Sequence, residues 1–332
     1  MVSPKAFADD PLRLMRAFSL SAQTGFEINA ATLKAIKKQA QLIINPAMER
    51  IREELFKVFH SPRAHATILQ LEETKLLVRV VPQVEVMFGV KQGGYHHLDV
   101  WRHSLQVLAE LEDLLIEFKQ DPKIAAYLQE AVGGGHTREA LLKFSALLHD
   151  IGKPATAKKE KDRMTFHSHE HVGASIVRHV AKHLKLTVRE RYWLEDAVRW
   201  HLRPGYLSNF KQPSAKAVFR YLRDTKEEAV AIALLAIADQ RSTCGPKTTV
   251  EKTRHHEAIC RMTIAEYYRD KAKPVIKRVL TGNDLIKILK LKPSPLFAKI
   301  LTKVEEELAL GKITTKEEAL DLAKTISLRK TK

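Results

Sequence analysis

Apolar residues recur at intervals of three and four along almost the whole of this 332-residue chain. This spacing gathers apolar side chains on one face of an α-helix, whereas the alternation typical of β-strands is scarce. Residues 75–88, KLLVRVVPQVEVMF, are the one stretch that reads as extended, and Pro82 interrupts it. The pattern therefore predicts an all-α fold. The clearest expected helices cover residues 9–26, 99–118, 174–184, 229–242 and 295–310.

Turn-forming residues and the distribution of histidines divide the chain into three parts. We expect residues 1–85 to form an N-terminal helical unit. Residues 86–250 contain nearly all of the histidines that suggest chemistry and are expected to form a central unit. Residues 251–332 are basic and are expected to form a C-terminal helical unit.

The composition excludes several classes of protein. No apolar run reaches the roughly 18 residues that a membrane-spanning helix needs, so no membrane span is predicted. The first residues, MVSPKAFADD, lack the apolar core of a secretion signal. The two cysteines, Cys244 and Cys260, cannot form a disulfide framework or a four-thiolate zinc site, so a reducing cytoplasm is the expected location.

The net charge of +17 points to a polyanionic ligand. Such a surface attracts polyanions over roughly 8 Å in physiological salt, so we expect a nucleotide or RNA partner. Basic stretches that could contact it are residues 34–39, 52–57 and 272–278, together with the lysines of the C-terminal tail. Each of these stretches could equally be a solvated helix face.

Histidines and aspartates stand at the edges of the expected buried helix faces. His103 lies three and four residues from Val100 and Val107, so it borders an apolar row. His149 and Asp150 follow at the point where the next helix ends. Gly152 comes two residues later and is expected to let the chain turn away at once.

Two further segments add to this set. Asp239 lies at the tail of the apolar run within 229–242, a helix that is apolar all round and is therefore expected to be central to its domain. A carboxylate that enters a core costs several kcal/mol unless a cation compensates it. Residues 166–174, FHSHEHVGA, carry three histidines, and His201 precedes a proline-glycine turn.

Imidazoles and carboxylates suit divalent transition metals, and two such metals can share a bridging carboxylate. Each residue alone has a simpler explanation, because a lone histidine is usually a hydrogen-bonded core residue and Asp239 could pair with Arg241. The ordered set H…HD…H…H…D is hard to obtain by chance. It predicts a site for one or two divalent ions, and Mn, Fe, Co, Ni and Mg all remain open.

This pattern resembles the HD-domain metal-dependent phosphohydrolases. The residues that carry the resemblance are His103, the pair His149 and Asp150 within LLHDIGKP, and Asp239 within LLAIADQRS. The resemblance implies that these four residues hold one metal ion. A second resemblance, to bacterial tRNA nucleotidyltransferases and poly(A) polymerases, implies that the flanking segments are a helical neck and body and a tail.

In the two-metal members of that family, two more histidines hold a second ion and the aspartate of the dipeptide bridges both. His201 matches one of these positions. His169 matches the other through a stretch similar to F-x-x-H-x-x-x-G-A, with His167 or His171 as alternatives. Lys153 matches a lysine that approaches the scissile phosphate in some members.

The resemblance implies a hydrolytic reaction. Metal coordination lowers the pKa of water to about 7, so that it attacks a phosphate ester. Asp150 and Lys153 are the catalytic residues that this mechanism requires. We therefore expect a phosphodiesterase or phosphatase, including 2′,3′-cyclic substrates, that acts on nucleotides or RNA ends. A structural metal site without turnover is the alternative.

The flanking segments resemble a second family. Residues 2–36, 45–59 and 280–320 are similar to the segments that follow the catalytic head in bacterial tRNA nucleotidyltransferases and poly(A) polymerases, many of which carry an HD domain. The head of that family has a Gly-Gly turn, an Arg-Asp pair and paired aspartates for two magnesium ions. We find none of these motifs, so nucleotidyl transfer is not expected from this chain alone.

Several residues in the flanks are candidates for nucleotide or RNA binding through this resemblance. Ser19 and Leu20 depart from the Arg-Phe that is usual in the family. The candidates that remain are Asp10, Arg13, Arg16, Arg50 and Arg52.

The phosphohydrolase is the leading hypothesis. The second hypothesis is an RNA- or tRNA-binding body of a split or truncated nucleotidyltransferase, with a structural metal site. A regulatory HD protein that senses a nucleotide is a third. The sequence leaves open whether the chain is a stand-alone protein or works with a separate head subunit. It also leaves the oligomeric state open.

Overall fold

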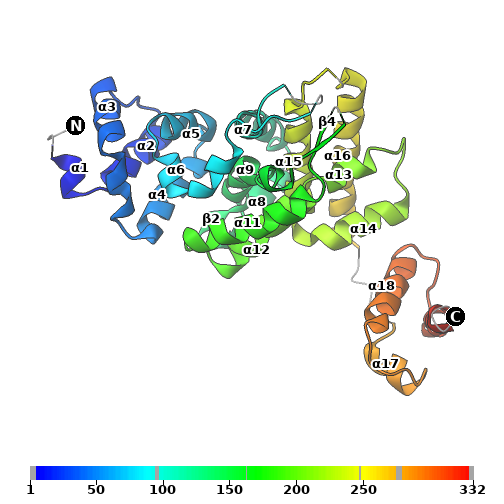
Figure 1. Cartoon of the computed structure of the whole chain (residues 1–332). Coiled ribbons are helices and arrows are strands. Elements are labelled where there is room, and N and C mark those ends of the chain that lie inside the picture. The colour runs from blue at the N-terminus through cyan, green and yellow to red at the C-terminus, as the bar shows by residue number, and fades with distance from the viewer. Residues whose placement is uncertain (1–4, 94–96, 162, 247, 274–278, 329–332) are drawn as a thin grey trace.

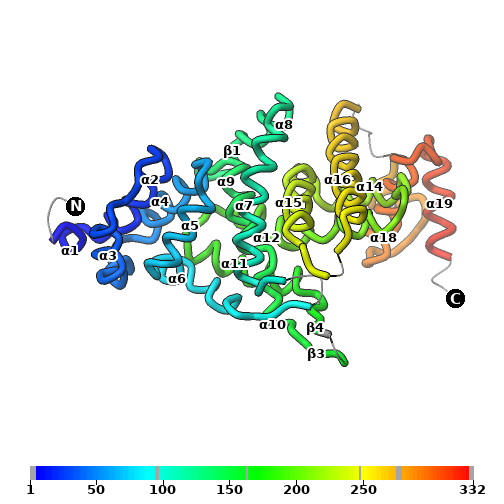
Figure 2. The backbone as a smooth tube through the Cα atoms, turned by 90° about the horizontal axis from the view of Figure 1, so that it is seen from above, coloured from blue at the N-terminus to red at the C-terminus, as the bar shows by residue number. Residues whose placement is uncertain are grey.

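The computed structural model describes residues 5–93, 97–161, 163–246, 248–273 and 279–328. Helices dominate this part of the chain, and its strands form only two short antiparallel hairpins, which confirms the all-α prediction. The helices follow one another along an elongated molecule, with the two termini at opposite ends in both views (Figures 1 and 2).

The N-terminal unit is built on α2 and α4, which pack against each other. Along α2 the buried residues Leu14, Met15, Phe18 and Ala22 follow helical spacing, and the helix ends at Gly25 in the left-handed conformation. Its elements are α1 (Ala6–Asp9), α2 (Arg13–Thr24), α3 (Ala30–Gln39), η1 (Ala40–Ile44), α4 (Met48–His60), α5 (Ala64–Glu73), α6 (Leu77–Val80) and η2 (Pro82–Met87).

The expectation of an extended segment over residues 75–88 is wrong. The chain there forms α6 and the 3₁₀-helix η2. Pro82 opens η2, where its fixed φ suits a helix start and its missing N–H would have no partner anyway. Leu77, Val80, Val84 and Met87 are buried at spacings of three and four, which is helical periodicity that the run of valines conceals.

The central unit surrounds α15, which is buried from Ala229 to Ala238 and packs between α7 and α16. The prediction that this helix is central is confirmed, and α7 coincides closely with the helix expected over 99–118. The elements are α7 (Val100–Phe118), α8 (Pro122–Gln129), β1 (Ala131–Gly133), β2 (His136–Thr137), α9 (Arg138–Leu148), α10 (Lys153–Thr156), β3 (Lys158–Glu160), β4 (Arg163–Thr165), α11 (His169–His183), α12 (Val188–Trp200), α13 (Arg203–Leu207), α14 (Ala215–Thr225), η3 (Lys226–Glu228), α15 (Ala229–Ser242) and α16 (Val250–Lys271).

The C-terminal helices have a core of their own. They are α17 (Gly282–Lys287), α18 (Leu296–Ala309) and α19 (Lys316–Leu328). One hydrophobic cluster extends from Phe7 to Tyr267, and a second one extends from Leu280 to Ala323. The predicted division at residues 85 and 250 stays a prediction.

Glu306 joins the C-terminal helices to the central unit. Its side chain on α18 is only 2% exposed, and it accepts contacts from Lys216 at 2.8 Å and Arg220 at 2.6 Å, both on α14. Lys303 of the same helix lies 2.8 Å away as well. The two cations of α14 on this buried carboxylate therefore fix α18 against α14. No helix in the described ranges is both long and apolar enough to cross a membrane.

Candidate metal centre

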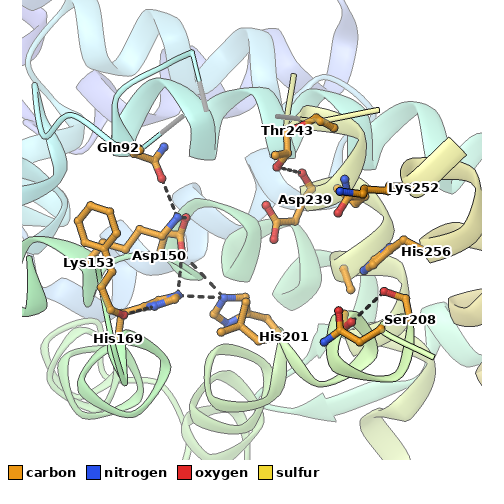
Figure 3. A pocket seen from close by; sticks show the side chains of 18 of the residues that line it. Gln92, Asp150, Lys153, His169, His201, Ser208, Asp239, Thr243, Lys252 and His256 are labelled. Carbon is orange, nitrogen blue, oxygen red and sulfur yellow. Dashed lines mark hydrogen bonds and ion pairs between the residues drawn. The ribbon is translucent and has the colours of Figure 1, made fainter. Parts of the chain in front are cut away.

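Six side chains predicted from the sequence converge at one place in the central unit. His103 comes from α7, His149 and Asp150 from the end of α9, His169 from the start of α11, His201 from the end of α12 and Asp239 from α15. Figure 3 shows Asp150, His169 and His201 pointing toward one another, with Asp239 across the cavity.

Asp150 stands between two groups of histidines. Its Oδ2 atom lies 3.2 Å from Nε2 of His149 and 3.8 Å from Nε2 of His103. Its Oδ1 atom lies 3.2 Å from Nε2 of His169 and 3.8 Å from Nε2 of His201. Within the described residues, these side chains form two triads that could each hold a metal ion, and both triads include Asp150.

Asp239 completes the first group. Its Oδ1 atom lies 2.9 Å from Nε2 of His103 and 3.8 Å from Nε2 of His149. The side chain of Asp239 is 23% exposed and faces the cavity, whereas His103 and His149 are buried. The first group is therefore two histidines and two carboxylates, and the second is two histidines and one carboxylate oxygen.

Backbone carbonyls set the orientation of three of the histidines. His149 Nδ1 lies 2.9 Å from the Ala146 carbonyl, and His169 Nδ1 lies 2.8 Å from the Phe166 carbonyl. His201 makes the same contact with the carbonyl three residues before it, at 2.6 Å. Because a carbonyl only accepts, each Nδ1 carries the proton. Each Nε2 then offers its lone pair to the centre, as metal-binding histidines require.

Charge and burial act in opposite directions on these groups. Burial, followed by the influence of His149 and His169, lowers the pKa of His201 to about 3, so this imidazole is neutral at physiological pH. Burial by itself would raise the pKa of Asp150, but His149 and Lys153 outweigh it and hold the pKa well below its ordinary value. A neutral imidazole and an ionised carboxylate are the forms that bind metals.

The residues present fit a divalent ion. His149 Nε2 and Asp150 Oδ2 are fully buried and lie 3.2 Å apart, and Asp150 Oδ2 also pairs with Lys153 Nζ. A neutral imidazole nitrogen and a carboxylate oxygen are both lone-pair donors, so their convergence suits a metal ion. His103, His149, Asp150 and Asp239 would hold one ion, and His169, His201 and Asp150 a second.

Lys153 lies beside this centre. Its Nζ atom lies 2.5 Å from Asp150 Oδ2 and donates to Gln92 Oε1 at 2.6 Å. Gln92 was not predicted, because a single glutamine in a loop gives no sequence signal. Gly152 has φ of −81°, so it does not adopt the left-handed conformation. A Cβ atom there would lie 2.1 Å from the His169 carbonyl oxygen, so the glycine allows α11 to approach.

The alternatives to His169 lie outside the centre. The His167 side chain is 76% exposed and the His171 side chain is 56% exposed, and each contacts a glutamate instead. His169 alone among the three belongs to a candidate metal triad.

The flanking candidates for RNA binding lie on the surface of the N-terminal unit. Arg13, Arg16 and Arg50 are exposed. Asp10 accepts a hydrogen bond from the backbone N–H of Leu12, the residue that precedes α2. Arg52 is committed within the protein, because it bonds to Glu53 and to the Lys185 carbonyl. The predicted stretch 272–278 lies outside the described residues from position 274 onward, as do the lysines at 330 and 332.

Three family models match successive parts of the chain. The first is described as "Probable RNA and SrmB-binding site of polymerase A" and covers residues 25–88. The HD domain model covers residues 100–243 and contains all six converging side chains. The third, "tRNA nucleotidyltransferase domain 2 putative", covers residues 217–323.

Curated relatives are similar over nearly the whole chain. The A-adding tRNA nucleotidyltransferase of Deinococcus radiodurans is 29% identical over 96% of this chain and 69% of its own length. The CC-adding tRNA nucleotidyltransferase of Thermus thermophilus is 28% identical over 93% of this chain and 65% of its own length. The chain thus spans about two thirds of these relatives.

Solved structures show the same fold. The CCA-adding enzyme of Thermotoga maritima in complex with tRNA aligns with 98% of this chain and 63% of its own, with a TM-score of 0.52 and 14% identity. An unliganded CCA-adding enzyme aligns with 96% of this chain and 60% of its own, with a TM-score of 0.54 and 14% identity. At this identity the likeness concerns the fold alone.

These comparisons correct the leading functional hypothesis. The expectation of a phosphohydrolase is wrong, because the relatives that match along nearly the whole chain are tRNA nucleotidyltransferases, which points to nucleotidyl transfer. The HD domain match covers residues 100–243, and the relatives that are similar through this segment are named for another reaction. We therefore assign no hydrolytic step to Asp150 or Lys153.

Proposed function

We propose that this chain takes part in adding nucleotides to the 3′ end of tRNA, as the part of a tRNA nucleotidyltransferase that holds the tRNA. The observation that carries the proposal is the similarity to the A-adding and CC-adding enzymes over 96% and 93% of the chain. It extends through the RNA-binding, HD and C-terminal segments alike, so it does not rest on the HD motif.

The charge of the chain supports this function. A net charge of +17 suits a tRNA, because phosphate neutralisation by lysine and arginine releases counterions and drives binding. On α3, within the segment that matches an RNA-binding model, Lys34, Lys37 and Lys38 are exposed. Their spacing of three and four puts them on one face of the helix, opposite the buried Ile36.

A second group of cations lies on the neighbouring helices. Arg13 and Arg16 are exposed and three residues apart on α2, and Arg50 is exposed on α4, which packs against α2. We assign the phosphate contacts to Arg16, Arg50 and the α3 lysines. Arg13 and Arg52 have no part in this proposal, because their guanidinium groups are bonded within the protein.

The transfer step requires the magnesium-binding carboxylates of a nucleotidyltransferase head. We assign that step to such a head, either on the same polypeptide or on a partner subunit. In this scheme the metal centre has a structural role. One or two ions bound by His103, His149, Asp150, His169, His201 and Asp239 would tie together α7, α9, α11, α12 and α15, and so stabilise the unit that connects the two flanks.

The test measures the affinity of the purified chain for a tRNA that lacks its 3′-terminal CCA, by fluorescence anisotropy at several salt concentrations. We expect the affinity to fall steeply with salt, with a log–log slope of about −0.7 to −0.9 for each phosphate contact. Replacing Lys34, Lys37 and Lys38 by Gln reduces the magnitude of the slope by about 2 to 3.

The matched control replaces three other exposed basic residues, Lys123, Lys182 and Arg189, which lie outside the RNA-binding match. A flat salt dependence, or equal losses in the two triple variants, contradicts the proposal. In the presence of a nucleotidyltransferase head, the α3 variant should also incorporate less labelled nucleotide into the same tRNA.

A further inference from the structure

Two helices that carry metal ligands also hold the N-terminal unit. α7 carries His103, and α9 leads directly into His149 and Asp150. In both views α7 and α9 lie between the N-terminal helices and α15 (Figures 1 and 2). Elsewhere on each of the two helices, a charged side chain contacts the turn between α4 and α5. That turn lies within residues 25–88, the segment that matches the RNA-binding model.

Lys143 of α9 makes the first of these contacts. Its side chain is only 2% exposed, and its Nζ atom donates to the Ser61 carbonyl, at the end of α4, at 2.7 Å. The same Nζ atom lies 3.4 Å from Glu139 Oε1 and 3.6 Å from Glu112 Oε1. Lys143 precedes His149 by six residues, which is about 9 Å along a helix. The helix that ends in two metal ligands therefore also holds the end of α4.

Glu112 of α7 makes the second contact. Its Oε1 atom accepts from the Ala64 N–H at 2.8 Å, and its Oε2 atom accepts from the His65 N–H at 3.2 Å. These are the first two residues of α5, whose N–H groups have no partner within the helix. A carboxylate is also favourable at the positive end of a helix dipole. The helix that carries His103 therefore caps α5.

α4 connects these contacts to the surface proposed to bind phosphates. Phe56 and Phe59 of α4 pack against Phe144 of α9, with ring centroids 5.7 and 5.1 Å apart. Arg50, near the start of α4, is exposed and is one of the proposed phosphate contacts. A shift of α4 on α9 therefore moves a residue of the RNA-binding surface.

The metal site and these contacts depend on the same separation of α7 and α9. His103, His149 and Asp150 form a candidate triad across the two helices, so an ion bound to them would hold the helices together. Glu112 and Lys143 pair across the same two helices at 3.6 Å. An ion that binds the packed arrangement more tightly than a loosened one shifts the population toward the packed arrangement.

We propose that ion binding at the metal centre strengthens tRNA binding by the N-terminal unit, with Glu112 and Lys143 as the positioning residues that transmit the effect. The inference rests on the proposed tRNA binding and adds its regulation. Such coupling is reciprocal, so bound tRNA raises the affinity for the ion by the same factor. We expect a factor of about five to ten, at the lower end of the usual range.

The experiment compares two forms of the full chain. One form is stripped of metal with a chelator, and the other is loaded with Mn²⁺ and freed of excess ion by gel filtration, so that free ions do not act on the RNA. Fluorescence anisotropy gives the affinity of each form for a tRNA that lacks its 3′-terminal CCA. The loaded form should bind about five to ten times more tightly.

Glu112→Gln tests the positioning role. The variant keeps the shape of the side chain but loses its charge opposite Lys143, so the ratio of the two affinities should fall close to one while the Mn²⁺ content stays unchanged. Glu110→Gln is the matched control, because Glu110 lies on the same helix and bonds to Gln106 of that helix. A residue with a merely structural role would lower both affinities alike and leave their ratio as it is.

The proposal is overturned if the two forms bind the tRNA equally, or if the Glu112 and Glu110 variants give the same ratio. The reciprocal measurement is the Mn²⁺ affinity of the chain with and without the tRNA, and an Mn²⁺ affinity that the tRNA leaves unchanged also overturns it. Absence of tRNA binding in both forms overturns the proposed function together with this inference, whereas equal binding overturns this inference alone.

Discussion

The Asp239 carboxylate lies 2.9 Å from Nε2 of His103, although 136 residues separate the two in the sequence. This contact brings the end of α15 against α7, the two helices that pack along the middle of the central unit. His149 and Asp150 form a candidate metal triad with His103, so a cation at this place would also compensate the charge of Asp239.

Asp150→Asn should abolish most metal binding. Asp150 belongs to both candidate triads, and an amide oxygen is a much weaker ligand than a carboxylate. Elemental analysis of purified protein should show one or two ions per chain in the wild type and close to none in the variant. Asp113→Asn is the control, because Asp113 is exposed on α7. An unchanged metal content in the Asp150 variant rules out the proposed ligand set.

The two histidine groups should be separable. His201→Gln removes a ligand from the second triad only, whereas His103→Gln removes one from the first. If two ions bind, each variant should lose one of them, which titration with Mn²⁺ followed by paramagnetic resonance can count. Loss of both ions in the two variants alike would mean that the ions bind only as a pair.

Metal affinity should decrease as the pH falls. Burial by itself would lower the pKa of His149, but the Asp150 carboxylate outweighs it and raises the pKa above the ordinary value. A proton on His149 therefore competes with the metal below that pKa, and each unit of pH costs up to about tenfold in affinity for this one group. Calorimetry at several pH values in buffers of different ionisation enthalpy counts the released protons. A pH-independent affinity would argue against His149 as a ligand.

Gly152→Ala should destabilise the protein and weaken the metal centre. The added Cβ would meet the His169 carbonyl at 2.1 Å and the Gly173 nitrogen at 2.6 Å, so α11 must move away. We expect a loss of about 1–3 kcal/mol in the free energy of unfolding, measured with denaturant. Gly205→Ala is the matched control, because its nearest neighbour is 3.6 Å away, and a comparable loss there would refute this explanation.

Glu306→Gln should loosen the C-terminal helices from the central unit. The change leaves Lys216, Arg220 and Lys303 without their shared carboxylate, at a cost of about 2 kcal/mol. Hydrogen exchange along α18 should become faster, while exchange in α15 stays as it is. Glu317→Gln on α19 is the control, since Glu317 is exposed. Equal exchange in both variants would show that other contacts hold α18.

Local sequence was enough for most of the helices. The apolar periodicity of residues 99–118 and 229–242 predicted α7 and α15 closely. The spacing of apolar residues indicates directly whether one face of a helix or the whole helix is buried. The prediction failed at residues 75–88, which read as extended. There Leu77, Val80, Val84 and Met87 are buried at helical spacing, which the neighbouring valines conceal.

The predicted reaction, phosphate-ester hydrolysis, was a larger error than the extended segment at residues 75–88. The HD residues are a strong signal for a type of site, but the same site can belong to proteins of different activity. The backbone carbonyls that orient His149, His169 and His201 were not predicted. In each case the carbonyl belongs to the residue three positions before the histidine.

The sequence by itself determined which segments are helical and which residue types could bind a metal, because both follow from short-range spacing and side-chain chemistry. Only the tertiary structure decided that Asp150 faces two histidine groups with its two oxygens, that His169 rather than its neighbours joins them, and that Lys252 of α16 closes the same cavity. These relationships join helices that are far apart in the chain, and their geometry depends on how the helices pack.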